Sequence, residues 1–143
     1  MIFSLKISRL EDYDRPRQQV GLWNRLVWLD HGNEVVFVPA GMEFNNEVYI
    51  GSGWLLEFDT SFYHSFMTRY QEDYNNALFA EKASSMVFIP VPDKLNMELN
   101  DLAYLLKEAI QLSKSPLYLQ SYTDLILLNV NRCYVQCEKG ISL

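Results

Sequence analysis

The pattern of apolar and polar residues changes its period once along the chain. Up to about residue 91, apolar residues come in short runs that alternate with period two, as in strands with one favoured buried face. Two such runs, VVFV and GWLLEF, lie between Val35 and Phe58, and turn residues such as Pro39 separate them. After residue 93 the apolar residues recur at steps of three and four, which is typical of helices. The pattern predicts a small β-barrel at about 1–91 and a helical part at about 93–139.

Further strands and a short helix are expected around this central stretch. Strand-like runs cover residues 2–7, 22–29 and 86–91, and Pro90 restricts the last run to an edge or an end of the sheet because it has no N–H to donate. Residues 59–61 supply helix-capping side chains ahead of apolar residues at helical spacing, so a short helix is expected there. Residues 70–82 are acidic and amide-rich, which favours a loop or a partial turn of helix.

The two C-terminal helices differ in how their apolar residues are spread. The first starts near Asp93 or Asn96 and carries a single stripe, formed by Leu95, Leu99, Leu102, Leu106 and Ile110. The second runs from Pro116 to about Lys139 and has too many apolar residues for one stripe. It therefore needs covering on two sides, and a second copy of the chain can supply the outer cover. The expected dimer interface is Leu119, Tyr122, Leu125 and Leu128, whereas Ile126, Val130 and Cys133 are expected to face the protein's own body.

Length, composition and charge narrow the class of protein. The 143 residues suit a single domain, and a hydrophobic fraction of 49% argues against extended disorder. The net charge of −6, from 12 basic and 18 acidic residues, excludes strong binding of this chain to DNA, because nucleic-acid binders usually show a basic footprint. No run of eighteen apolar residues and no secretory leader is present, so we expect a cytoplasmic protein without a membrane contact.

Candidate catalytic and metal-binding residues are few. The chain has two histidines, His31 and His64, which are separated by the whole central stretch. Cys133 and Cys137 are four apart and are interpreted as two small apolar residues on one helix face. We therefore expect no metal, no cofactor and no enzymatic activity. The alternative is a small metal-dependent enzyme, which would need clustered His and carboxylate ligands.

Several motifs together resemble the N-terminal sensor half of transcription regulators of the AraC family. They are a tryptophan-containing strand ending in glycine (residues 26–32), an apolar run into a proline-glycine turn (36–41), the strand GWLLEF (53–58) and the helix segment LLNVNR (127–132). The resemblance covers Leu22 to Arg132. It implies a fold that is mainly β with α: a cupin-like (double-stranded β-helix) barrel followed by two antiparallel helices. The family usually carries another hairpin between Gly32 and Pro39, where this sequence has only a short link.

The resemblance also implies a function. Sensor domains of this family bind a small-molecule effector, often a sugar or another metabolite, in the barrel, and they form homodimers. Contact with DNA would occur only through a separate helix-turn-helix domain, which residues 1–143 do not include. Aromatic and polar side chains suited to such an effector are Trp23, Arg25, Trp28, His31, Phe37, Tyr49 and Trp54. Arg25 stands out among them, because an arginine at the centre of a strand must find a partner or a stacking face. The alternatives are a metal-dependent small cupin enzyme and a dimerisation adaptor without a ligand.

Overall fold

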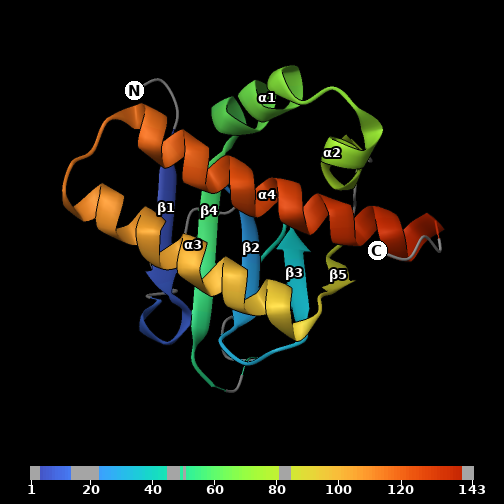
Figure 1. Ribbon diagram of the computed structural model, residues 1–143, viewed down its shortest axis with the longest axis horizontal. Helices are drawn as coiled ribbons and strands as arrows, with labels where there is room; N and C mark the ends of the chain where they lie inside the picture. Colours follow the sequence, from blue (N-terminus) through green and yellow to red (C-terminus); the bar gives the residue numbers. More distant parts are fainter. Residues whose placement is uncertain (1–3, 14–22, 45–48, 50, 81–84, 140–143) are drawn as a thin grey trace.

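A single antiparallel sheet forms the centre of the molecule, with helices on one side (Figure 1). The computed structural model describes residues 4–13, 23–44, 49, 51–80 and 85–139. The strands lie in the order β1-β4-β2-β3-β5, and every neighbouring pair is antiparallel. The bounds of the strands are β1 Leu5–Arg9, β2 Trp23–Leu29, β3 Glu34–Val38, β4 Gly53–Asp59 and β5 Val87–Pro90.

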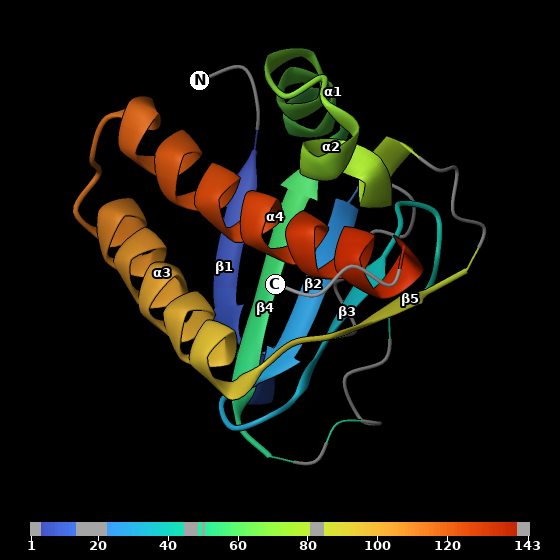
Figure 2. The same cartoon turned by 45° about the vertical axis from the view of Figure 1, so that its right-hand side comes forward.

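The barrel predicted from the sequence, cupin-like or otherwise, is wrong. Among the described residues, β1 pairs with β4 alone and β5 pairs with β3 alone, so the sheet is open at both edges. A barrel needs its two outermost strands to pair with each other. Here α3 and α4 cover one face of the sheet, and the interior is therefore a layer between sheet and helices (Figure 2). The chain is a mixed α/β fold in which two long helices follow the sheet.

In the described part of the chain, four α-helices and one short 3₁₀ turn accompany the sheet. Asp59 caps the first helix, and its side chain accepts a hydrogen bond of 2.9 Å from the backbone N–H of Phe62, as its sequence position predicts. Residues expected to form a loop or a partial turn contain a complete helix of eight residues, α2. The bounds are η1 Leu10–Asp12, α1 Thr60–Arg69, α2 Asp73–Ala80, α3 Asp93–Gln111 and α4 Pro116–Lys139.

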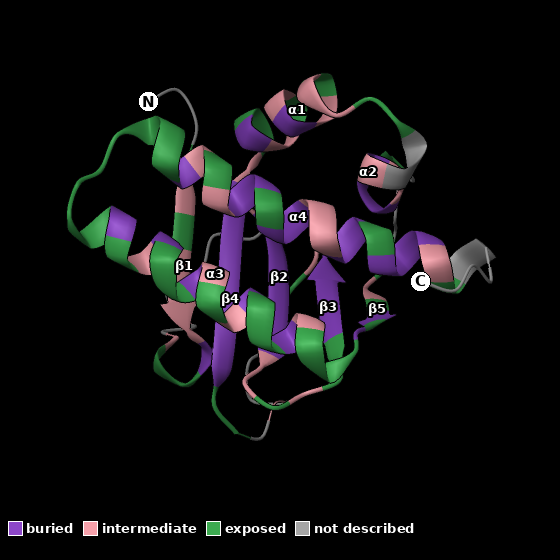
Figure 3. Ribbon diagram, viewed as in Figure 1, coloured by how far each residue is buried: buried purple, intermediate pink, exposed green. Residues whose placement is uncertain are grey.

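The two faces of the sheet are covered differently. The face under α3 and α4 holds the larger apolar core, to which Leu26, Leu56 and Phe58 contribute from the central strands. The opposite face carries a smaller cluster of Val27, Val36 and Leu55, over which Phe44 packs from the segment after β3. Because both faces are buried, β2 and β4 are almost entirely inaccessible along their length (Figure 3).

Glycine is required where β4 begins. Gly53 pairs with Leu29 of β2, and a Cβ atom at this position would lie 2.3 Å from the carbonyl oxygen of Trp28. The backbone N–H of Gly53 donates to Oε1 of Glu11 at 3.1 Å, which ties the start of β4 to η1. This close approach explains the glycine in the motif GWLLEF by backbone packing.

Two asparagines fix α3 to the end of β2. Asn96 donates to the carbonyl oxygen of Leu29 at 3.2 Å, and Asn100 donates to that of Asp30 at 2.9 Å. Asn100 also accepts a hydrogen bond of 3.0 Å from Nε1 of Trp28, a side chain that is 1% exposed. These contacts satisfy polar groups at the buried end of the strand and set the position of the helix along the sheet.

Candidate functional site

The outward face of α4 is the candidate functional surface. It consists of the exposed residues Leu117, Tyr118, Ser121, Leu125 and Arg132 together with the half-buried Tyr122, Leu128 and Asn129. Leu117 and Tyr118 are 67% and 51% exposed, and Leu125 is 45% exposed. Arg132 is the only charged residue with an exposed side chain among the described side chains of α4, residues 116–137. An exposed helix face with so little charge is typical of an interface.

The predicted dimer residues fall on both sides of this helix. Leu125 is exposed, and Tyr122 and Leu128 are half-buried. Leu119, also predicted for the interface, is 7% exposed and packs in the core. The line of Ile126, Val130 and Cys133 is buried beneath the helix, at 3% exposure or less. The helix therefore has an apolar inner face and a partly apolar outer face.

A shallow groove between α3 and α4 extends the outward face. Its volume is about 240 Å³, and it lies between Leu95 and Glu98 of α3 and Asn129 and Arg132 of α4. Because the two helices are antiparallel, this register places the C-terminal half of α3 beside the N-terminal half of α4. The outward face of α4 thus continues into the groove at Arg132.

The seven predicted ligand residues do not converge on one cavity. Trp28, Phe37 and Trp54 belong to the core between the sheet and the helices, and none is more than 5% exposed. The Trp54 ring also carries the guanidinium of Arg9, 4.5 Å from its centroid. Trp28 and Trp54 are cross-strand neighbours. These three aromatic residues pack in the core, and Nε1 of Trp28 also donates to Asn100.

Two of the remaining predicted residues, Arg25 and Tyr49, both lie near Phe44 at the opposite face of the sheet. Arg25 is 0% exposed, and its Nε donates to Glu57 of β4 at 3.1 Å. The ring of Phe44 lies 6.0 Å from the Arg25 guanidinium and 6.0 Å from the ring of Tyr49. Burial raises the pKa of Tyr49, and the nearby Glu34 carboxylate adds to this effect. Arg25 thus has both an ion-pair partner and an aromatic neighbour.

A small pocket lies beside Tyr49, and the other two predicted residues lie apart from it. The pocket has a volume of about 120 Å³ and is lined by residues of β2, β3 and the turn between them, among them Val27, Val36 and the predicted residue Trp28. Trp23 is half-buried, and Lys6 sits over its ring at 4.5 Å from the centroid. His31 is exposed in the turn after β2, where a cleft of about 270 Å³ separates that turn from the start of α3. The predicted set is therefore divided among four places.

Metal-ligand residues are scattered over the described part of the chain. Within the described ranges, no three His, Cys, Asp or Glu side chains come together in a way that could hold a metal ion. His64 lies exposed on α1 and its ring contacts that of Tyr63. Burial raises the pKa of the Cys133 thiol, and Cys137 is exposed one turn further along α4.

Sequence reasoning missed a polar cluster where α1 meets α4. Arg69, in the last turn of α1, is ion-paired with Asp124 of α4, and the hydroxyl of Tyr70 donates to the same carboxylate at 3.1 Å. Burial raises the pKa of Asp124, and the bonds from Arg69 and Tyr70 oppose that rise. A signal for this cluster exists in the sequence, because Asp124 is the only acidic residue between Leu117 and Asn131, and a lone buried carboxylate needs a cation.

Comparisons with known proteins find no family. No protein-family model, no curated protein and no solved structure matches this chain. Among the described residues, no helix combines the length and the apolar character that a bilayer crossing requires.

Proposed function

We propose that this chain is a non-catalytic regulatory module that forms a homodimer through α4, as in the sensor half of an AraC-type transcription regulator. The observation that supports this proposal best is the outward face of α4, which is apolar at Leu117, Tyr118 and Leu125 and nearly free of charge. In this proposal the module is cytoplasmic, responds to a small-molecule effector, and contacts DNA only through a separate domain. The proposal does not include the barrel that the sequence predicted as the effector site, because the sheet is open.

A second copy of the chain suits this face because its residues complement one another about a two-fold axis. In an antiparallel pairing of α4 with its copy centred on Leu125, each residue meets the one equally far on the other side of the centre. Tyr118 then meets Arg132, a cation–π pair, and Ser121 meets Asn129, a polar pair. Tyr122 meets Leu128, and Leu125 meets Leu125. Each charged or polar group on the face thus finds a suitable partner, as a self-complementary interface requires.

Sedimentation velocity tests the proposed dimer with one substitution on each helix. Leu125→Asp places a carboxylate at the centre of the proposed contact, and Tyr104→Asp places one on α3 at a side chain that is 61% exposed. Burying a leucine is worth about 1.5–3 kcal/mol, and two copies meet at the axis, so Leu125→Asp should weaken dimerisation by at least about 100-fold. The parent and Tyr104→Asp should sediment as dimers, and Leu125→Asp as a folded monomer. A monomeric parent at high micromolar concentration, or a Leu125→Asp variant that folds and still dimerises, would refute the proposal.

An adaptor without a ligand is the second candidate function. It is favoured by the positions of the predicted ligand residues, since Trp28, Phe37 and Trp54 fill the core and Arg25 is paired with Glu57. The two candidates share the dimer and differ only in whether a small molecule binds.

A further inference from the structure

The groove between α3 and α4 has the size and the chemistry of a site for one side chain. Its deeper lining residues, the half-buried Leu95 and the buried Cys133, are apolar, whereas Glu98 and Arg132 are exposed at its rim. Its volume of about 240 Å³ lies below the range of about 300–1,000 Å³ that is usual for small-molecule pockets. The groove therefore suits a single inserted side chain better than a separate ligand.

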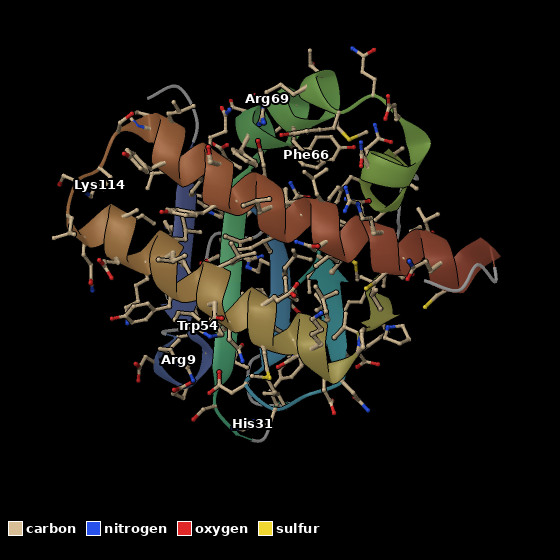
Figure 4. All side chains as sticks on the ribbon, in the orientation of Figure 1. Arg9, His31, Trp54, Phe66, Arg69 and Lys114 are labelled. Carbon is tan, nitrogen blue, oxygen red and sulfur yellow. The ribbon has the colours of Figure 1, made fainter. Side chains whose placement is uncertain are left out.

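Tyr118 is an exposed aromatic residue of α4 that lies far from the groove of its own copy. Its side chain is 51% exposed. Its ring centroid lies 5.7 Å from Nζ of Lys114, which Figure 4 shows in the turn between α3 and α4. Arg132, at the groove, lies about 21 Å further along α4, at a rise of about 1.5 Å per residue. Tyr118 therefore cannot enter the groove of its own copy.

The antiparallel pairing proposed above brings Tyr118 of one copy to the groove of the other. Tyr118, Leu125 and Asn129 are spaced by seven and four residues, so they lie on one stripe of α4. The two-fold axis reverses the direction of α4 but keeps α3 on the same side of the helix pair. Tyr118 then comes opposite Arg132 and close to Asn129, and both of these residues line the groove.

We propose that Tyr118 of each copy docks in the groove between α3 and α4 of the other copy. This inference rests on the homodimer proposed above and adds α3 to its interface. The ring packs against Leu95 and Cys133. Nδ2 of Asn129 donates to the carbonyl oxygen of Leu125 at 2.8 Å, so the amide oxygen of Asn129 is the atom that can accept from the Tyr118 hydroxyl.

The residue type fits this role. A tyrosine has an apolar ring and a polar tip, which matches a groove that is apolar at depth and polar at its rim. Aromatic side chains that fill pockets near the centre of an interface carry much of its binding energy. Because the axis is two-fold, each copy supplies one such side chain and one groove, and the contact occurs twice.

Sedimentation equilibrium of tyrosine variants tests the docked side chain. Tyr118→Ala empties both grooves of the dimer and should weaken dimerisation by at least about 100-fold, since each lost contact costs at least about tenfold. Tyr118→Phe keeps the ring and should retain most of the affinity that Tyr118→Ala loses. Tyr104→Ala is the matched control, because Tyr104 is 61% exposed on α3 and does not line the groove, and it should leave the dimer unchanged.

A mixture of two variants tests the groove itself. Leu95→Trp fills the groove but keeps Tyr118, whereas Tyr118→Ala keeps the groove but lacks the inserted side chain. Each variant alone forms no docked contact, and a mixed dimer forms one. The mixture should therefore associate at least about tenfold more tightly than either variant alone. Glu98→Trp, at an exposed position of the same groove, is the second blocking variant and should give the same result.

The outcomes separate the docked tyrosine from the proposed dimer. A parent that dimerises and becomes monomeric with Leu125→Asp, but still dimerises with Tyr118→Ala, would refute the docking and leave the dimer intact. Weaker dimerisation of Tyr118→Ala without recovery in either mixture would place Tyr118 elsewhere in the interface and would also overturn the docking. A monomeric parent would refute the dimer and the docking together.

Discussion

The two long helices lie on the same face of the sheet, yet their outward faces differ. On α3 the exposed residues include Asp93, Lys94, Glu98, Asp101 and Glu108, whereas on α4 the only exposed charge among residues 116–137 is Arg132. The inner faces are alike, since both carry side chains that are 0% exposed. An apolar period therefore shows only that a helix is packed on one side. The charge content of the other side indicates whether that side meets water or a partner.

The largest expected effect comes from the inner faces, which should respond alike. Leu99→Ala on α3 and Ile126→Ala on α4 each remove a side chain that is 0% exposed. Each should lower the free energy of unfolding by about 2–5 kcal/mol, because a cavity is left in the core. Urea unfolding of both variants measures this. A loss below about 1 kcal/mol for either variant would contradict equal packing of the two helices, because it lies well below the expected range.

The next effect tests the polar anchoring that α3 has at the end of β2. Asn100→Leu leaves Nε1 of Trp28 and the carbonyl oxygen of Asp30 without their partner. The free energy of unfolding should fall by about 1–3 kcal/mol, and the Trp28 indole signal in NMR should shift. Glu98→Gln, on the exposed side of the same helix, is the control and should change neither. Unchanged stability of Asn100→Leu would mean that packing alone holds α3.

The smallest effect is a pH dependence of the free energy of unfolding that arises from Asp124 of α4. Burial raises the pKa of Asp124 above its ordinary value of 3.8, so the folded state binds this proton more tightly than the unfolded chain does. The parent should therefore gain stability relative to Asp124→Asn as the pH falls through the raised pKa, and the gain should be complete below the unfolded value. Unfolding of the parent and of this variant across that pH range gives the difference.

The control for this pH dependence is Asp101→Asn on the exposed side of α3. The difference between the parent and this variant should change less with pH than the difference between the parent and Asp124→Asn. The reverse order would show that the Asp124 carboxylate is better solvated than its burial implies.

Local features of the fold could be predicted from the sequence, and the pairing of strands could not. The alternating runs contain β2, β3, β4 and β5, and the helical period contains α3 and α4. The barrel failed because closure depends on which strands pair, as in Leu5 with Phe58, and such contacts join residues far apart in the chain. The short helix α2 was missed because its few apolar residues pack against α4, a tertiary contact that its own sequence does not show.

In the candidate sites, too, local features could be predicted from the sequence and long-range pairings could not. Exposure of Leu125 follows from the excess of apolar residues on one helix, which is a local property. The pairing of Arg25 with Glu57 and of Arg69 with Asp124 requires the register of β2 with β4 and the packing of α1 on α4. The position of Arg25 at the centre of a strand predicted that it has a partner, and the fold identifies that partner as Glu57.

The open sheet has two edges, and edges of sheets are templates for aggregation. Here both are poor templates. β5 has four residues and ends in Pro90, which has no N–H for an incoming strand, and β1 has five residues with Lys6 placed over Trp23. Short, charged or proline-ended edge strands discourage the growth of a continuous sheet between molecules. These two edge strands therefore discourage association through the sheet, and the dimer proposed above would leave both sheet edges unpaired.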